Sequence, residues 1–378
     1  MNQRLQSQIS QKFKELYSSA PKSFSAPGRI NIIGEHTDYN EGFVLPAAID
    51  KRIYFAVGVN EVKKHRFYSY DFMQSEESAD LLVTEKTKHW AKYLIGVLAQ
   101  FENLNLYFDV VFGGDIPAGA GLSSSAALES GMAVAVNEFL KAGKSKFELV
   151  KMAQKAEHDY AGVLCGIMDQ YASVFGKENQ VIKLDCRTNT HEYFPLDLKD
   201  YELLLVDTKV KHSLASSEYN LRRQECERAV AYYQQKYAEV KSLRDLKLEQ
   251  LELNQPNEIS YKRSKYMVEE IRRVNLATKA LEMGDLDSLG TLLYQTHEGL
   301  QHLYQVSCPE LDFLVDQSRD MDAVLGARMM GGGFGGCTLN LIKRDAIENF
   351  KSSIKTNYEK QFHQSPDFYL VKIENGAN

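Results

Sequence analysis

The sequence predicts an α+β fold in two domains of similar size, and three observations support this. The chain has 378 residues, which exceeds one typical core and suits two domains of roughly 100 to 200 residues each. Short β-like runs and glycine-rich turns dominate the first half, whereas long helical patterns dominate the second half, which returns to a strand near its end. We therefore expect domains over residues 1–195 and 196–378.

The first domain is expected to begin with an amphipathic helix. Leu5, Ile9, Phe13 and Leu16 recur at helical spacing among charged and polar residues. The following segment, 23–59, contains β-branched and aromatic runs separated by Gly, Pro and Asn. This pattern predicts short strands joined by turns, and hence a β-rich layer.

A loop rich in Gly and Ser joins the next strand to a helix. Residues 105–112 are β-like, and residues 126–140 are rich in Ala, Leu and Met. Between them, Gly119 and Gly121 permit backbone conformations closed to other residues, and the serines are expected to supply an N-cap. The free N–H groups at such a helix start bind anions, above all phosphate. The same stretch also fits an ordinary Gly/Ser loop with a capped helix.

The remaining elements follow from the same patterns. A helix is expected over 146–162, and a further helix should begin near Asp169. The other expected strands and long helices cover residues 180–186, 191–196, 201–208, 216–241, 261–283, 285–305 and 337–342.

Composition and charge favour a small-molecule partner. Hydrophobic residues make up 44% and charged residues 25% of the chain, as in an ordinary globular protein. A net charge of −6 gives no general attraction to nucleic acid or an anionic membrane. The five scattered cysteines form no metal-ligand spacing, and no leader or membrane span is recognisable. We expect a cytoplasmic protein with reduced thiols.

A second glycine loop, GGGFGG over 331–336, matches the GxGxxG pattern of dinucleotide-binding proteins. That fingerprint should follow a strand and open a helix, whereas this loop runs into the expected strand CTLNLI. The context therefore argues against dinucleotide binding. No GxxxxGK[ST] motif and no protein-kinase motif set occurs in the chain.

Three clusters together resemble the signature motifs of the GHMP small-molecule kinases. They are APGRINIIGEHTDYNEGFVLP (26–46), the Gly/Ser loop and GGGFGG. The first is similar to the signature peculiar to the galactokinase family, and the similarity continues through CGIMDQYASVFG, HSLASSEYNLRRQEC and VSCPELD. This resemblance implies the two-domain GHMP kinase fold, with the active site in the cleft between the domains.

The first cluster has the chemistry of a sugar site. Glu35, His36 and Asp38 lie within four positions, with Arg29 just upstream, and supply the donors and acceptors that a polyhydroxylated ligand needs. Taken alone, they also fit a polar turn with internal salt bridges or an accidental metal-like cluster. The family resemblance implies sugar contacts from Arg29, Glu35, His36, Asp38, Gly166, Asp169 and Tyr219.

Taken alone, Asp169 fits a carboxylate at a helix N-terminus, where the helix dipole stabilises negative charge. The resemblance implies instead that Asp169 faces the anomeric hydroxyl and that Arg29 lies between it and the transferring phosphate. A nearby arginine lowers the pKa of an aspartate and keeps it ionised, which suits a base that accepts a proton. Phosphoryl transfer otherwise depends on positioning and electrostatics.

The resemblance also assigns nucleotide and metal contacts. Mg²⁺ would be held by Ser124 or Ser125 and by Glu157, and Trp90 or Tyr93 would stack on adenine. The ATP phosphates would be held by the loop residues Gly119, Ala120, Gly121, Leu122, Ser123, Ser124, Ser125 and Ala126. On their own, Trp90 fits a core aromatic and Glu157 an exposed helix residue.

Two further positions bear on the nucleotide site. Lys211 stands where the family often has arginine, and its ammonium group cannot make the bidentate phosphate contact of a guanidinium. The second glycine loop would approach the nucleotide loop and close the site, which requires backbones to come near each other. Its glycines are Gly331, Gly332, Gly333, Gly335 and Gly336.

The implied activity is ATP-dependent phosphorylation of the anomeric hydroxyl of α-D-galactose to galactose 1-phosphate and ADP, the first committed step of galactose catabolism. Two alternatives stay open: a kinase for N-acetylgalactosamine or a related sugar, and a non-catalytic sensor of galactose and ATP. The expected partners are galactose and ATP, with Mg²⁺ as cofactor. A monomer is expected because core packing explains the apolar helix faces.

Overall fold

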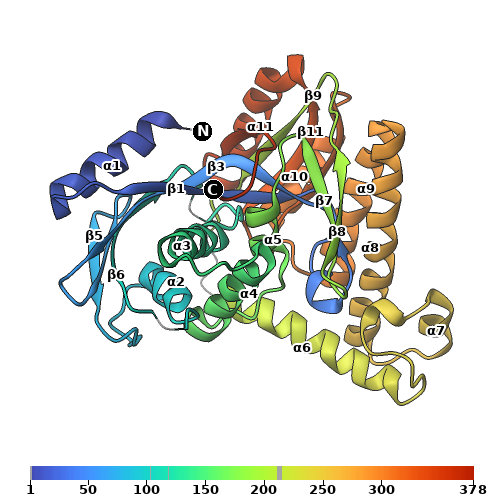
Figure 1. Ribbon diagram of the computed structural model, residues 1–378. Helices are drawn as coiled ribbons and strands as arrows, with labels where there is room; N and C mark the ends of the chain where they lie inside the picture. The colour runs from blue at the N-terminus through green and yellow to red at the C-terminus, as the bar shows by residue number, and fades with distance from the viewer. Residues whose placement is uncertain (1, 103, 118, 211–214) are drawn as a thin grey trace.

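A computed structural model of the chain describes residues 2–102, 104–117, 119–210 and 215–378 and contains three sheets (Figure 1). The largest is a five-stranded sheet with strand order β1-β3-β6-β4-β5, in which β4 and β6 run parallel and the other neighbours antiparallel. Its strands are β1 (Lys22–Asn31), β3 (Pro46–Asn60), β4 (His65–Ser69), β5 (Gln74–Ser78) and β6 (Tyr107–Gly114).

Side chains alternate across β3, so each face of this sheet has its own core. Tyr54 and Ala56 pack on the N-terminal helix α1 (Gln3–Tyr17), which buries Ile9 and Phe13 but leaves Leu16 40% exposed. Phe55 and Val57 belong to the opposite core, beneath helices. Those helices are α2 (His89–Leu98), α3 (Ser124–Leu140), α4 (Lys146–Ala156) and α5 (Met168–Phe175).

Two sequence predictions for this half need correction. The expected short strands of segment 23–59 are mainly two long ones, β1 and β3, because β1 continues past Pro27 through a shift in register. Proline is tolerated at such a bulge, where it need not donate to the ladder. The helix expected over 146–162 ends as an α-helix at Ala156 and continues as a π-helical turn, η2 (Glu157–Ala161).

The second half contains a four-stranded antiparallel sheet in the order β10-β11-β9-β12. Leu203 and Leu205 face one core, and Leu204 and Val206 face another beneath α10 and α11. The elements are β9 (Tyr201–Asp207), β10 (Val324–Met329), β11 (Cys337–Lys343), β12 (Asp367–Val371), α10 (Pro309–Arg319) and α11 (Ile347–Phe362).

The remaining elements lie beside these two sheets. A three-stranded sheet consists of β2 (Phe43–Val44), β7 (Gln180–Asp185) and β8 (Thr190–Pro195). The other helical elements are η1 (Asp38–Asn40), α6 (Ala215–Gln234), η3 (Leu243–Asp245), α7 (Leu248–Leu253), α8 (Glu258–Met283), α9 (Leu286–Glu298), η4 (Gly299–Tyr304) and η5 (Arg344–Ala346).

The helix expected over 216–241 is shorter than predicted. It ends at Gln234, and Val240 and Leu243 turn back into the core that α6 shares with α8. The sequence patterns also did not predict β4, β5 and α2 in the first half, or β10, β12, α7, α10 and α11 in the second. The second glycine loop consequently joins two antiparallel strands, β10 and β11.

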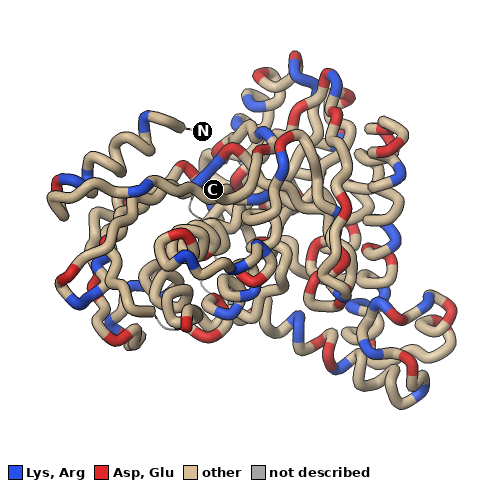
Figure 2. Tube along the Cα trace, in the orientation of Figure 1, with Lys and Arg blue, Asp and Glu red and all other residues tan. Residues whose placement is uncertain are grey.

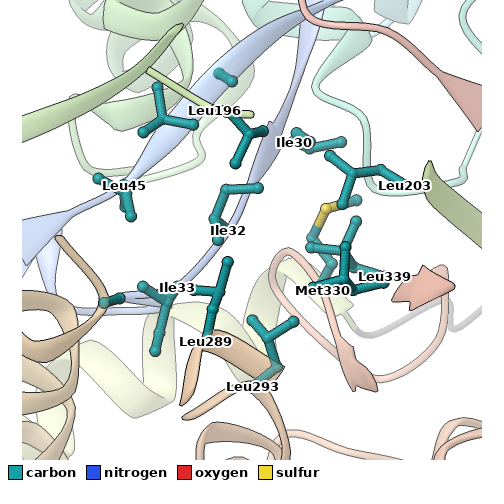
Figure 3. Packing of buried hydrophobic residues seen from close by; sticks show 14 of the residues in the cluster. Ile30, Ile32, Ile33, Leu45, Leu196, Leu203, Leu289, Leu293, Met330 and Leu339 are labelled. Carbon is teal, nitrogen blue, oxygen red and sulfur yellow. The ribbon is translucent and has the colours of Figure 1, made fainter. Parts of the chain in front are cut away.

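One hydrophobic cluster connects the two halves (Figure 3). Ile30, Ile32 and Leu45 from the first half pack with residues such as Leu289 and Leu339 from the second. The chain that follows β1 is therefore buried between the two halves at Ile32 and Ile33. This burial fixes the position of the residues that come next, which begin at Gly34. Along the chain trace, Lys and Arg are interspersed with Asp and Glu in both halves (Figure 2). Within the described residues, no helix combines the length and apolar character needed to cross a membrane.

Candidate active site

The bulge in β1 places Arg29 against the Gly/Ser loop. At Gly28, a Cβ atom would lie 2.6 Å from the carbonyl oxygen of Leu122, so only glycine permits this approach. The next residue, Arg29, donates its backbone N–H to the same carbonyl at 3.1 Å. Its side chain is 4% exposed, and the loop and strand are thereby joined at a buried cation.

Arg29 and Asp169 form a bidentate ion pair. Nε of Arg29 donates to Oδ1 of Asp169 at 2.7 Å, and Nη2 donates to Oδ2 at 2.8 Å. Nη1 donates to the Gly121 carbonyl at 2.6 Å. Burial alone would lower the pKa of Arg29, but Asp169 and Glu35 raise it above its ordinary value. A cation is thus fixed between the loop and the carboxylate.

Ser123 does not act as the expected N-cap. It occupies the N-cap position of α3 in a left-handed conformation, with φ of 57°, and makes no side-chain cap hydrogen bond. Its hydroxyl instead donates to Oδ2 of Asp169. The first turn of α3 carries no acidic side chain either. The N–H groups of this turn therefore remain uncapped by side chains, as an anion site requires.

The sequence-predicted sugar residues line one cavity of about 140 Å³ between the two halves of the chain. Three residues that sequence reasoning did not single out, Val163, Cys165 and Met168, also line it. The predicted residues in its wall are Arg29, Glu35, His36, Asp38, Glu157, Gly166, Asp169, Tyr219, Gly331 and Gly332.

Glu35 is held by an arginine that sequence reasoning missed. Arg328, fully buried on β10, donates Nη2 to Oε1 of Glu35 at 2.9 Å. Gly331 N–H donates to the same oxygen at 2.8 Å, and Asn31 donates to Oε2 at 3.0 Å. Burial would raise the pKa of Glu35, but Arg328 and Arg29 lower it below its ordinary value. Glu35 therefore joins the two halves beside the cavity as a carboxylate.

His36 and Asp38 present different groups to the cavity. Burial lowers the pKa of His36 to about 4, so the ring is neutral at neutral pH. Its Nδ1 lies 2.8 Å from the Tyr39 hydroxyl, while its buried Nε2 has no hydrogen-bond partner in the described protein. Burial and the charge of Asp169 raise the pKa of Asp38 to about 6. One oxygen of Asp38 accepts from Tyr39 N–H at 3.0 Å.

Gly166 is required by its contact with Asp38. A Cβ at residue 166 would lie 1.7 Å from Oδ2 of Asp38, which no contact tolerates. Gly166→Ala should therefore displace Asp38 and raise the KM for the sugar at least about 10-fold, the size of one lost charge-assisted hydrogen bond. The KM for ATP should stay unchanged, and steady-state kinetics in both substrates checks this. An unchanged sugar KM would remove Asp38 from the sugar contacts.

Asp38 should also make stability depend on pH. The pKa of Asp38 rises from 3.8 to about 6 on folding. Protonation of this carboxyl therefore stabilises the folded state, and this contribution is fully present below about pH 4 and is lost as pH rises through about 6. Asp38→Asn should therefore raise Tm at pH 8 by about 1 to 4 °C, for about 1 to 3 kcal/mol of stability. The gain should vanish near pH 4 in thermal melts. A gain of equal size at both pH values would contradict this account.

A second hollow, of about 570 Å³, lies beside the Gly/Ser loop. Trp90, Tyr93, Ser124 and Ser125 line it as the nucleotide assignment requires. Sequence reasoning missed the rest of its wall, which is mainly apolar and includes Ile53, Asp71, Phe72, His89, Phe112, Gly114, Ile116 and Leu128. An apolar slot with a few polar groups is the usual form of a small-molecule site.

Ser125 and Glu157 connect the two hollows. The Ser125 hydroxyl donates to Oε1 of Glu157 at 3.1 Å, whereas Ser124 is exposed at the start of α3. Burial and Asp169 raise the pKa of Glu157 to about 7. Gln170 donates to Oε2 of Glu157 at 2.7 Å and to Glu129, a fully buried carboxyl, at 3.1 Å. This crowding of carboxyl oxygens favours a cation.

The two glycine loops are in contact. A Cβ at Gly331 would lie 3.3 Å from the Gly121 carbonyl oxygen, and one at Gly336 would lie 3.5 Å from that of Ala120. Gly333 and Gly335 instead approach the carbonyl oxygens of Val306 and Val210.

Other predicted loop residues face the core or lie outside the described chain. Ala120, Leu122 and Ala126 are buried, the first two in the core that connects the halves. Gly119 is left-handed, with φ of 80°. Lys211 lies outside the described residues, so its expected phosphate contact stays a prediction.

Comparisons with known proteins show which family the chain resembles. Residues 11–59 match the galactokinase galactose-binding signature, residues 92–177 the GHMP kinases N terminal domain, and residues 276–360 the GHMP kinases C terminal family. A galactokinase of Thermotoga maritima is 44% identical over 93% of this chain and 98% of its own. A galactokinase of Clostridium beijerinckii is 40% identical over 97% of this chain and 96% of that protein.

Solved structures give the same result. The structure of Lactococcus lactis galactokinase complexed with galactose superposes with a TM-score of 0.94 at 34% identity and covers 99% of both chains. Methanococcus jannaschii mevalonate kinase has a TM-score of 0.66 at 17% identity, covering 94% of this chain and 99% of its own, and so shares the fold. The expected two-domain GHMP kinase fold is confirmed. On these similarities over nearly its whole length, the chain belongs to the galactokinase family of the GHMP kinases.

Proposed function

We propose that this kinase transfers the γ-phosphate of ATP to the anomeric hydroxyl of α-D-galactose. The observation that carries the proposal is the bidentate Arg29–Asp169 pair, which lies in the wall of the small polar cavity and also bonds the Gly/Ser loop. The sugar would occupy this cavity and the adenine the larger apolar hollow. The reacting oxygen and phosphorus would then meet at the pair.

The cavity residues suit a hexose. Asp38 and Glu35 offer acceptors, His36 and Tyr219 offer ring nitrogen and hydroxyl groups, and Arg29 offers donors. A sugar that lacks a matching hydroxyl would leave one of these buried groups unpaired, which costs much more affinity than a lost apolar contact. We therefore expect galactose to be strongly preferred over its epimer glucose.

Asp169 is proposed as the base and Arg29 as its electrostatic partner. Oδ1 of Asp169 accepts one hydrogen bond from Arg29, so a lone pair remains for the hydroxyl proton of the sugar. As that proton moves to Asp169, the sugar oxygen attacks the phosphorus and ADP leaves. Arg29 stabilises the negative charge on the transferring phosphate, and the uncapped N–H groups of α3 hold the neighbouring phosphates.

The residues present fit Mg²⁺. Ser125 and Glu157 supply adjacent oxygen ligands, and Glu129 adds an unpartnered buried carboxyl oxygen behind them. Mg²⁺ prefers oxygen donors, few of them from protein. We propose that Ser125 and Glu157 hold the ion, with Ser124 exposed to the nucleotide. When bound, the metal would neutralise part of the negative charge of the nucleotide phosphates.

A substrate panel tests the proposal. The protein, ATP and Mg²⁺ would be incubated separately with galactose, N-acetylgalactosamine, glucose, mevalonate and homoserine, and ADP release would be measured. The proposal predicts the highest kcat/KM with galactose. A preference for N-acetylgalactosamine would keep the kinase and change its sugar, whereas galactose binding without any ADP release would favour the sensor.

A further inference from the structure

Behind His36 lies a row of hydrogen-bonding groups that does not reach the cavity. Nδ1 of His36 is 2.8 Å from the Tyr39 hydroxyl, which is 2.7 Å from the Tyr304 hydroxyl. The Tyr304 hydroxyl is in turn 3.2 Å from Sγ of Cys226. Tyr39, Tyr304 and Cys226 come from η1, η4 and α6 and are absent from the cavity wall. The row contacts the candidate sugar site by its hydrogen bond to His36, and the ring of Tyr39 also packs on that of Tyr219 at 5.5 Å.

The row is rigidly packed. Tyr304 and Cys226 are 0% and 2% exposed, and the ring of Tyr304 lies 4.9 Å from that of His36 and 4.7 Å from that of Tyr266. The ring of Tyr219 also packs on that of His36, at 5.2 Å. Tyr39 is half-buried, and with Cys226 it borders a separate hollow of about 250 Å³. The side chains of the row are already in place before any ligand binds.

A neutral imidazole carries one proton, so one ring nitrogen donates and the other accepts. Each phenol in the row donates one hydrogen bond. All the hydrogen bonds of the row can therefore point either toward His36 or away from it. An imidazole nitrogen is a better acceptor than a phenol oxygen, and a thiol is a weak donor and a weak acceptor. The favoured direction has Tyr39 donating to Nδ1 and Tyr304 donating to Tyr39. The proton of His36 is then on Nε2, a buried nitrogen that makes no hydrogen bond of ordinary geometry with the described residues, although the Gly332 backbone interacts with the ring.

We propose that Tyr39, supported by Tyr304 and Cys226, is a positioning residue that fixes His36 in the Nε2–H tautomer, so that the ring presents a donor to a sugar hydroxyl oxygen. This rests on the proposed function, in which the cavity takes galactose. The proposal adds that the sugar oxygen opposite His36 acts as a hydrogen-bond acceptor. Residues outside the cavity set this requirement. The second hydrogen bond of a histidine commonly sets its tautomer in this way.

The first test reads the tautomer directly and needs no substrate. The full chain would be labelled with ¹⁵N-histidine, and the two ring nitrogens of His36 would be assigned by NMR with a His36→Gln variant. The proposal predicts Nε2 protonated and Nδ1 unprotonated in the unmodified protein, and a mixture of tautomers in Tyr39→Phe. A proton on Nδ1, or an unchanged spectrum in Tyr39→Phe, would overturn it.

Tyr233→Phe is the matched control. Tyr233 is fully buried in the same core as Tyr304 and Cys226, but its hydroxyl has no hydrogen-bond partner among the described residues. This variant should leave the ring signals of His36 unchanged. A shift as large as that in Tyr39→Phe would show that any lost buried hydroxyl disturbs the ring, and would overturn the proposal.

The second test uses galactose and its 2-, 3-, 4- and 6-deoxy analogues. Tyr39→Phe should lower kcat/KM for galactose about 5- to 10-fold, and Tyr304→Phe about 2- to 3-fold, the scale of one hydrogen bond weakened. The analogue that lacks the hydroxyl bonded by His36 should respond to neither change. Equal losses with all five sugars would indicate a packing effect and contradict the proposal. If no sugar is phosphorylated, the proposed function fails while the NMR result still tests the tautomer.

Discussion

Asp169→Asn should reduce kcat about 10²- to 10⁴-fold, because a positioned general base contributes this factor. Asparagine preserves the shape of the side chain and still accepts from Arg29, but its amide cannot take the proton of the sugar hydroxyl. The dissociation constants for galactose and ATP should stay close to those of the unmodified protein. Stopped-flow or steady-state turnover, combined with calorimetric titration of each ligand, separates the two effects.

The matched control is Asp159→Asn. Asp159 lies on η2, its side chain is 46% exposed, and its ion-pair partner is Lys155. The same chemical change there should leave turnover unaltered. If Asp169→Asn kept near-normal turnover, Asp169 would have no role as base and the transfer would depend on Arg29 and the phosphate loop alone.

Arg328→Met should lower the free energy of unfolding by about 3 to 5 kcal/mol, the cost of leaving a buried partner charge unpaired. Besides Glu35, Arg328 donates to the carbonyl oxygens of Ile32 and Met329 at 2.8 and 2.6 Å, and to that of Asn31. Methionine fills similar space but satisfies none of these acceptors. Urea unfolding of both proteins measures the difference.

An exposed ion pair provides the control for Arg328. Arg344 and Glu202 meet at 2.8 Å, and the arginine side chain is 62% exposed. Arg344→Met should change stability by less than about 1 kcal/mol, because water solvates the remaining charge. The double variant Glu35→Gln/Arg328→Met should recover part of the loss. Equal effects of Arg328→Met and Arg344→Met would contradict a central role for the buried pair.

The local patterns of the chain predicted most elements. The Gly/Ser loop between β6 and α3, the helix that begins near Asp169, and strands β7 to β9 all occur where periodicity and turn residues placed them. Periodicity could not reveal that β1 passes through Pro27, because a bulge depends on the neighbouring strand. The end of α6 was misplaced because Val240 and Leu243 fit a helical pattern but are buried by a turn.

The site was predictable only where a motif identified it. Arg29 and Asp169 are 140 residues apart in the chain, and family resemblance, not spacing, suggested that they meet. Arg328 gave no such signal, because a lone arginine in a β-like run usually marks a solvated position. The loop serines were expected to cap α3, yet Ser123, at the N-cap position, bonds Asp169 with its hydroxyl instead. Long-range polar contacts of this kind are set by the packing of two halves, which local sequence does not encode.

The Arg29–Asp169 pair is proposed to direct phosphate to the anomeric oxygen of galactose. The most direct measurement is ³¹P–¹H correlation NMR of the product formed from galactose, ATP and Mg²⁺. If the pair acts in this way, the product is one sugar phosphate whose phosphorus couples to H1 of the α anomer. Coupling to H6 or to any other ring proton, or no sugar phosphate at all, would contradict it.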